Sequence, residues 1–219
     1  MGRVAALFDL DKTLLDTSSG HLYARYRYRQ GEMGRGELLR AVWWSLMGSL
    51  GLLNMEAIIP RLLAEAVGQD EAEMRRSCDL WFVQDVIPHI TERGKRRVGE
   101  HQAQGHVVAL VSASTQYVVR PMADYLGIPD QYVCTHLESH AGRFTGRVTE
   151  PVCYGAGKIV WAERFAAEHG VDLEASYFYS DSISDLPLLE RVGHPVAVNA
   201  DPRLKRLARQ RGWPIERFY

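Results

Sequence analysis

Two pairs of carboxylates, each directly after a short apolar run, are the strongest chemical signal in the sequence. Asp9 and Asp11 follow the first of these runs, and Asp181 and Asp185 follow a later one. Carboxylates this close repel one another, so each pair favours a bound cation or a shared proton. Carboxylate oxygens are what Mg²⁺ takes in proteins, together with water and phosphate oxygens. The two pairs therefore predict a magnesium site that handles a phosphate group.

A hydroxyl and an ammonium group elsewhere in the chain could complete a site for phosphate. Ser112 ends the apolar run 107–111 and is expected to open a helix, so its hydroxyl and the amides from Ala113 onward could donate to an anion. Lys158 follows two glycines at an expected helix start, where the helix dipole disfavours a cation unless an anion is bound. Taken alone, Ser112 could be an N-cap, Lys158 a solvated surface residue and Asp185 a helix cap.

Five short apolar runs indicate the strands that would position these residues. Their continuous apolarity is typical of strands covered on both faces, and strands alternating with helices favour a parallel sheet. We therefore expect an α/β fold with a doubly wound, mainly parallel sheet. A two-stranded flap is expected around the central glycine of residues 142–149, and a closing helix between Asp201 and Gly212. The five runs are residues 4–8, 107–111, 132–134, 177–179 and 196–198.

Residues 17–89 differ from the rest because they carry long helical patterns and no convincing strand. We expect them to form an all-helical cap domain, inserted after the first strand into a core built from residues 1–16 and 90–219. Residues 41–55 of this insertion lack a charge, but they fall short of the about 20 apolar residues that a membrane span needs. We interpret this run as the buried or pocket-covering interior of the cap, with a peripheral membrane role as the weaker alternative.

Composition and charge exclude several classes of protein. The 219 residues carry 26 Lys and Arg against 27 Asp and Glu, a net charge of −1 that does not suit a nucleic-acid-binding surface. Three cysteines without a C-x-x-C spacing fit neither a disulfide framework nor a zinc site. The first residues lack the apolar core of a signal peptide. These features predict a cytoplasmic protein without stable membrane insertion, and they leave its oligomeric state open.

Competing motifs fail on their spacing. Val152 and Ile159 stand where a Walker phosphate loop needs Gly and Ser or Thr. The chain has no G-x-G-x-x-G after the first strand and no G-x-S-x-G, so a dinucleotide site and a serine hydrolase are unsupported. His136 and His140 have the spacing of a zinc helix, but the glutamate between them is displaced by one position. We expect these histidines to be structural or solvent-facing.

In their order along the chain, the chemical residues resemble the four motifs of the haloacid dehalogenase-like (HAD) phosphatase superfamily. The resemblance covers essentially the whole chain, and a helical insertion directly after the first motif resembles the phosphoserine-phosphatase-like branch, subfamily IB. It implies a HAD-like Rossmannoid core with a helical cap and an Mg²⁺-dependent phosphomonoester hydrolase that acts on a small phosphorylated metabolite. The motifs are Asp9-Leu10-Asp11-Lys12-Thr13, then Ser112, then Lys158, then Asp181 with Asp185.

The resemblance also implies how the acidic residues divide the reaction. Asp9 would be the nucleophile that takes the phosphoryl group as an aspartyl-phosphate, because a covalent route divides the barrier. Asp11 would protonate the leaving alkoxide and then activate the water that hydrolyses the intermediate. Mg²⁺ would be held by Asp9, the main-chain carbonyl of Asp11 and Asp181, with Asp185 a ligand or just behind the ligands. The metal would screen the carboxylate from the phosphate.

The remaining motif residues would bind phosphate. Ser112, the amide of Ala113 and Lys158 are implied to contact the phosphate oxygens, and Thr13 to support the loop of the first motif. In the phosphoserine-specific pattern the second motif reads Ser-Gly-Gly, whereas here Ser112 and Ala113 are followed by Ser114. This difference affects substrate recognition and leaves the chemistry unchanged.

The residues that would choose the substrate are less defined. Ser18 stands where phosphoserine-specific members carry a glutamate, so phosphoserine is one of several possibilities, and Glu32 could take over that role. Arg25 lies among tyrosines in the insertion and could reach an anionic substrate, although arginines covering a solvated face are the simpler interpretation. Histidinol phosphate, a sugar phosphate and a lipid-like phosphate stay open. The alternatives to a hydrolase are a phosphotransferase with the same intermediate and a catalytically silent module that binds a phosphorylated ligand.

Overall fold

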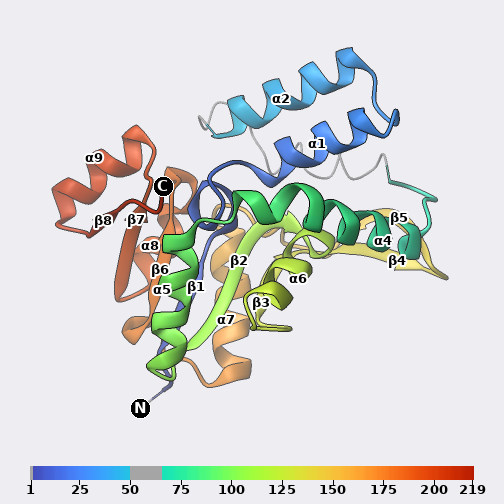
Figure 1. Cartoon of the computed structure of the whole chain (residues 1–219). Helices are drawn as coiled ribbons and strands as arrows, with labels where there is room; N and C mark the ends of the chain where they lie inside the picture. The colour runs from blue at the N-terminus through green and yellow to red at the C-terminus, as the bar shows by residue number, and fades with distance from the viewer. Residues whose placement is uncertain (1, 50–65) are drawn as a thin grey trace.

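The computed structural model describes residues 2–49 and 66–219, and its centre is a six-stranded parallel sheet (Figure 1). The strand order is β3-β2-β1-β6-β7-β8. All five strands predicted from apolar runs are present, and the α/β fold is confirmed. The strands are β1 Ala5–Phe8, β2 Val107–Thr115, β3 Tyr132–Thr135, β6 Tyr177–Ser180, β7 His194–Val198 and β8 Ile215–Glu216.

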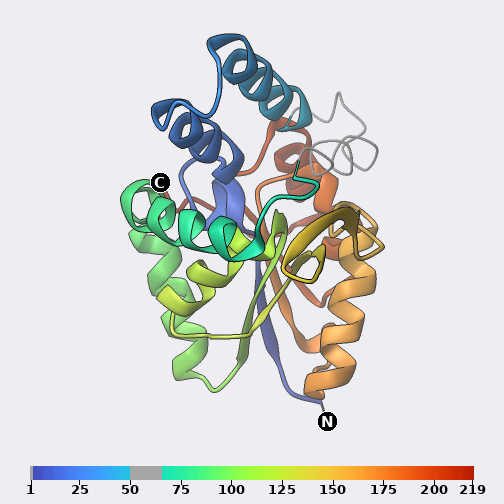
Figure 2. The ribbon, with the colours of Figure 1, turned by 90° about the vertical axis from the view of Figure 1, so that its right-hand side faces the viewer.

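Helices cover both faces of this sheet, as the continuous apolarity of its strands requires. In β1, Ala6 and Phe8 pack into a core cluster with α5 and α6, whereas Ala5 and Leu7 pack into a second cluster with α7, α8 and α9. The two clusters fix the sheet between two helical layers (Figure 2). These helices are α5 Glu92–Ala103, α6 Gln116–Tyr125, α7 Gly157–His169, α8 Leu186–Arg191 and α9 Pro202–Arg211.

The described part of the insertion is helical. Helices α1 (Ser19–Arg29), α2 (Arg35–Ser49) and α4 (Glu71–Trp81) precede α5, and α1 and α2 lie above the carboxyl end of the sheet (Figures 1 and 2). The domain boundaries at residues 16 and 90 stay a prediction. Most of the uncharged run 41–55 lies outside the residues whose side chains are described. Within it, the side chain of Trp43 is 58% exposed, so the expectation of burial is wrong at that position.

The predicted flap exists, but its turn was misplaced. The hairpin pairs β4 (Leu137–His140) with β5 (Arg143–Val148), so residues 142–149 supply only one of its strands. The chain turns at Ala141 and Gly142, where φ is 49° and 76°. Both residues therefore adopt the left-handed conformation that tight hairpin turns need. The segment from His136 to His140, which has the spacing of a zinc helix, is mainly strand.

The hairpin is joined to the chain that enters α4. The N–H of Gly68 donates to the carbonyl of Phe144 (2.9 Å), and the N–H of Glu71 donates to that of Gly142 (2.9 Å). The Glu71 carboxylate accepts hydrogen bonds from the hydroxyls of Tyr117 (2.9 Å) and Ser139 (2.5 Å). The insertion is therefore fastened both to the hairpin and to α6 of the core.

Two further expectations concern helix ends. Asp201 caps α9 by accepting from the N–H groups of Arg203 and Leu204, and Gly212 ends that helix with φ 67°, as predicted. Ser112, in contrast, does not open a helix, because β2 continues to Thr115 and α6 begins only at the next residue. None of the described helices is both long and apolar enough to cross a membrane.

Candidate active site

The carboxyl ends of β1, β2 and β6 and the start of α7 bring the motif residues to one edge of the sheet. Asp9 follows β1, Ser112 lies in the C-terminal half of β2, and Asp181 follows β6. The pairing of the neighbours β1 and β6 continues one residue past the end of β1, since the N–H of Asp9 donates to the carbonyl of Tyr179 (2.9 Å). Parallel strands therefore place residues that are far apart in sequence within reach of one another.

Lys158 lies at the centre of this site and is 2% exposed. Its Nζ donates to Oδ1 of Asp9 and to Oδ2 of Asp185, each at 2.7 Å. The hydroxyl of Ser180 donates to the same oxygen of Asp185 at 2.7 Å. The simpler interpretations of a surface lysine and of a helix cap at Asp185 are both wrong, because Lys158 is buried and the Asp185 side chain makes no cap bond. The buried pairings instead tie the first, third and fourth motifs together.

Lys158 reaches this depth because of the glycine before it. A Cβ on Gly157 would lie 2.0 Å from the carbonyl oxygen of Val152, so only glycine allows α7 to begin so close to the preceding loop. The ammonium group is thereby directed to the edge of the sheet, where Asp9 and Asp185 accept its protons.

Burial and crowding raise the pKa values of the carboxylates. Burial raises the pKa of Asp9 to about 7, with Lys158 opposing the rise and Asp185 adding to it. The pKa of Asp181 is raised well above its usual value by burial and then by Asp9 and Asp185. Burial works to lower the pKa of Lys158, but Asp185 and Asp9 outweigh it and the pKa is raised. One buried ammonium group thus faces three carboxylates, an excess of negative charge that fits a further cation.

Oxygen donors at this point are of the kind that magnesium takes. The carboxylates of Asp9 and Asp181 and the carbonyl of Asp11 lie at the ends of neighbouring strands. Within residues 2–49 and 66–219, no three acidic, histidine or cysteine side chains gather into a metal cage. Mg²⁺ typically uses one or two carboxylates, with water and phosphate oxygens completing its shell, so these are the groups that could hold it.

The loop after Asp9 has an irregular backbone that is fixed by hydrogen bonds. Lys12 has a positive φ of 55°, and its carbonyl accepts a hydrogen bond from Nδ2 of Asn199 (2.9 Å). The hydroxyl of Thr13, which is fully buried, lies 3.5 Å from Oδ2 of Asp9. The loop is therefore held on both sides, by Asn199 and by the buried hydroxyl.

Asp11 is held by the first residue of α1. The N–H of Ser19 donates to Oδ1 of Asp11 at 2.7 Å, and the Ser19 hydroxyl lies 2.9 Å from that of Ser114. The N–H of Ser114 donates to Oγ of Ser112 at 3.2 Å. Burial raises the pKa of Asp11, opposed by its hydrogen bonds with Ser19. A continuous hydrogen-bond chain thus joins the first motif, the insertion and the second motif.

Of the predicted substrate residues of the insertion, Arg25 and Glu32 lie apart from this network, whereas Ser18 directly precedes its member Ser19. Ser18 is the N-cap residue of α1, without a side-chain cap bond to the helix. Arg25 is exposed on α1, and Glu32 forms an ion pair with Arg27 (3.3 Å) on the surface. Half-buried Ala113 follows Ser112 in β2. Among the described contacts, none joins Arg25 or Glu32 to the motif residues, and their role stays a prediction.

Four residues support the site without being predicted to do so, although Asp201 is predicted as a helix cap. Ser180 directly precedes Asp181, and Asn199 and Asp201 follow β7, so their place at strand ends was a usable signal. Asp201 accepts from the N–H of Ile183 (2.6 Å), and its own N–H donates to the carbonyl of Asp181 (2.8 Å). Ser19 carried no such signal, because only the fold brings it to Asp11.

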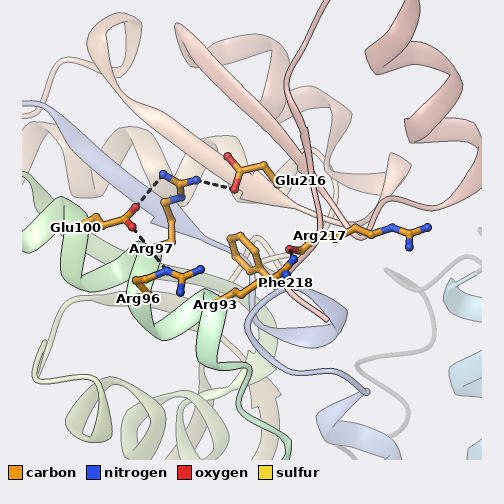
Figure 3. A pocket seen from close by; sticks show the side chains of 7 residues that line it. All are labelled: Arg93, Arg96, Arg97, Glu100, Glu216, Arg217 and Phe218. Carbon is orange, nitrogen blue, oxygen red and sulfur yellow. Dashed lines mark hydrogen bonds and ion pairs between the residues drawn. The ribbon is translucent and has the colours of Figure 1, made fainter.

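A separate pocket of about 280 Å³ lies between α5 and the C-terminal residues (Figure 3). Arg97 bridges Glu100 (2.9 Å) and Glu216 (2.8 Å) there. No motif residue lines it. It is lined by Arg93, Arg96, Arg97, Glu100, Glu216, Arg217 and Phe218.

The chain is similar to known proteins both in sequence and in structure. The model of the haloacid dehalogenase-like hydrolase family matches residues 6–190. A histidinol-phosphatase of Neisseria meningitidis serogroup C is 32% identical over 97% of this chain and 98% of its own length. A phosphoserine phosphatase of Mycobacterium tuberculosis is 31% identical over 98% of this chain and 70% of its own.

Two solved structures show the same fold. A crystal structure of a protein of unknown function from Bordetella pertussis has a TM-score of 0.89 and 31% identity, and all of both chains is covered. A phosphoserine phosphatase, solved as an analogue of its phospho-aspartyl intermediate, has a TM-score of 0.74 at 21% identity and covers 100% of this chain and 95% of its own. At that identity the second likeness concerns the fold alone.

Proposed function

Because the chain belongs to the haloacid dehalogenase-like hydrolases and is a phosphatase of that family, we propose that it hydrolyses the phosphomonoester of a small metabolite through an aspartyl-phosphate on Asp9. One observation carries this assignment: the buried Lys158 that holds both Asp9 and Asp185 at 2.7 Å. A lysine held against a carboxylate at the end of a parallel sheet supplies a positive charge, which stabilises a phosphate group bound beside that carboxylate nucleophile.

In the first step an oxygen of Asp9 attacks phosphorus and the ester P–O bond breaks. Lys158 holds Oδ1 of Asp9, which leaves Oδ2, 3.5 Å from the Thr13 hydroxyl, for the attack. Asp11 gives its proton to the leaving alkoxide. Because its Oδ1 accepts from Ser19, the proton is carried on Oδ2, and burial favours the protonated form of this carboxyl.

In the second step water attacks the phosphorus of the aspartyl-phosphate and Asp11 takes up the proton of that water. The P–O bond to Asp9 breaks, which frees the Asp9 carboxylate and releases inorganic phosphate. Ser112 would donate its hydroxyl proton to a phosphate oxygen, since its Oγ already accepts from the N–H of Ser114. When bound, Mg²⁺ would offset the repulsion between carboxylate and phosphate. Asp9, the carbonyl of Asp11 and Asp181 would hold the ion, with Asp185 beside them.

Asp9→Asn tests the assignment. The variant keeps the shape of the side chain but removes the nucleophilic oxygen, so phosphate release from phosphomonoesters should fall by about 1,000-fold or more. Phosphate is measured with Mg²⁺ present, and Asp172→Asn, at the other end of the sheet, serves as the control. Retention of wild-type release by Asp9→Asn would contradict the assignment.

Removal of the metal is a second test. Dialysis against EDTA should abolish phosphate release, and added Mg²⁺ should restore it. Without the ion, the buried carboxylates at this site repel a phosphate dianion. Full activity after exhaustive chelation would contradict the proposed cofactor.

The likeness to a histidinol-phosphatase over almost the full length of both proteins makes L-histidinol phosphate the first substrate to assay. Phosphoserine is the second, since another relative carries that name. Ser18 provides no carboxylate to pair with an ammonium group, and because phosphoserine and histidinol phosphate both carry one, this position does not choose between them. A comparison of kcat/KM for the two substrates decides between them. A cytoplasmic location stays a prediction.

A further inference from the structure

The hydroxyl pair of Ser19 and Ser114 joins the insertion to the core directly beside the proposed general acid. Ser19 is 1% exposed, although it lies in the first turn of a helix on the outside of the core. Its Oγ is 2.9 Å from that of Ser114, and its N–H donates to Oδ1 of Asp11 at 2.7 Å. One residue therefore contacts the carboxyl group of the first motif and the loop of the second.

From this geometry we propose that Ser19 and Ser114 are positioning residues that fix the Asp11 carboxyl for proton transfer to the leaving group. The proposal rests on the proposed function and deepens it. The Asp11 carboxyl has two oxygens, and only one of them can carry the proton at a time. By occupying Oδ1, Ser19 reserves Oδ2 for the proton. The Ser114 hydroxyl keeps Ser19 in place.

The start of α1 supports this assignment. The Asp11 carboxylate accepts from the first helical N–H, whereas the side chain of the N-cap residue, Ser18, makes no cap bond. A carboxylate at a helix N-terminus is favoured by the helix dipole and by the free N–H groups there. Helix α1 therefore orients Asp11 while Asp11 stabilises the helix, and the orientation of the acid depends on where α1 begins.

The hydrogen bonds that begin at Asp11 end at Ser112, in the proposed phosphate site. The Ser114 N–H donates to Oγ of Ser112 at 3.2 Å, so the hydroxyl proton of Ser112 is directed elsewhere. Displacement of Ser114 would thus disturb both the acid and a proposed phosphate donor, whereas loss of the Ser114 hydroxyl alone would disturb only the acid. Ser114→Ala removes the hydroxyl and keeps the N–H.

Leaving-group dependence separates positioning of the acid from general damage. Alkyl phosphates need a proton at the departing oxygen, whereas p-nitrophenolate leaves readily without one. The comparison uses kcat/KM, which reports only the steps up to loss of the leaving group and so excludes the second step that all substrates share. With Ser114→Ala and Ser19→Ala, kcat/KM for an alkyl phosphate such as L-histidinol phosphate or phosphoethanolamine should fall about ten-fold to a hundred-fold. For p-nitrophenyl phosphate kcat/KM should change by less than about three-fold, and Ser19→Thr, which keeps a hydroxyl, should restore most of the alkyl activity.

Two controls complete the experiment. Ser176→Ala removes another buried serine hydroxyl, which accepts from Ala5 N–H (2.8 Å) at the far end of the sheet, and should leave the ratio of the two activities unchanged. The double variant of Ser19 and Ser114 should be no worse than the poorer single variant, because both remove the same contact. Ser114 is only half-buried, so Ser114→Ala remains informative if Ser19→Ala does not fold.

An equal loss on both substrates, or no loss on either, would overturn the positioning role. These outcomes differ from failure of the proposed function, which would appear as wild-type protein without phosphatase activity or as an active Asp9→Asn variant.

Discussion

At the scale of single residues, Lys158 decides the electrostatics of the site. It lies 149 positions from Asp9 and 27 from Asp185, and it is the only described cation that hydrogen-bonds to either carboxylate. Removing one partner from a buried group of charges leaves the others without compensation, which is costly even where the complete group adds little net stability. The lysine therefore keeps the buried carboxylates in place, and in the proposed function it also binds phosphate.

Lys158→Met should lower kcat by about 100-fold or more, because a charged group that binds the phosphoryl oxygens is lost. The same variant should be less stable by about 3 kcal/mol, since the buried carboxylates of Asp9 and Asp185 lose the cation between them. Urea unfolding and phosphate release measure the two effects. Lys95→Met, which breaks an exposed pair with Glu92, is the control and should change neither by much. A fully active Lys158→Met enzyme would remove the lysine from the reaction.

At the scale of elements, the approach of α7 to the preceding loop determines where that lysine points. Gly157 is in the first turn of α7, and its Cα faces the carbonyl of Val152. A methyl group there would need the loop or the helix to move, and either shift displaces Lys158 from Asp9.

Gly157→Ala should therefore lower kcat by at least about ten-fold and reduce stability by about 1–3 kcal/mol, as expected for overpacking. Gly99→Ala is the control, because Gly99 lies exposed in α5 and a Cβ added there would meet no atom within 4 Å. That variant should gain about 0.5–1 kcal/mol from helix propensity and keep full activity. Thermal unfolding and initial rates test both. An active, stable Gly157→Ala protein would show that the loop gives way without moving the lysine.

The elements that the sequence predicted well are those with a local signal. Continuous apolar runs gave β1, β2, β3, β6 and β7, because strands buried on both faces have no polar alternation. Strand β8 has only two residues and offers no pattern. The hairpin turn was misplaced because Ala141, a residue without a preference for positive φ, takes up the left-handed conformation beside Gly142.

In the site, too, only the residues with a local sequence signal could be predicted. The motif residues at strand ends could be predicted because parallel strands finish at one edge. The burial of Lys158 and the contact of Ser19 with Asp11 could not, because each depends on how close two distant segments come in the fold. For the same reason Ser112 was expected at a helix start, whereas β2 continues through it to Thr115.

At the scale of the whole molecule, a buried histidine at the sheet face makes stability depend on pH. His101 is 4% exposed, and its two ring nitrogens lie 2.8 Å from His106 and from the hydroxyl of Tyr179. Burial lowers the pKa of His101 from 6.5 to about 4, with His106 and Arg97 adding to the shift. Between these two values the unfolded chain binds more protons than the folded one, so the contribution to stability is full above 6.5 and is lost as the pH falls toward 4.

The melting temperature of the protein should therefore fall more steeply between pH 7 and pH 4.5 than that of His101→Gln. At neutral pH the variant is the less stable protein, and the difference should shrink on acidification. His140→Gln, at an exposed position of β4, is the control and should follow the wild-type curve. Parallel curves for wild type and His101→Gln would assign the acid sensitivity to other groups.

The contact of Asn199 with the loop after Asp9 predicts how well position 199 tolerates mutation. Its Nδ2 donates to the carbonyl of Lys12 (2.9 Å), its Oδ1 accepts from the N–H of Phe218 (2.9 Å), and its φ is 46°. A carboxamide offers a donor and an acceptor at once, and asparagine is also among the few residues that adopt this backbone conformation readily. In a saturation library selected for activity, position 199 should therefore accept almost no replacement, although it is assigned no contact with substrate or metal. A selection based on survival would score it like a catalytic residue.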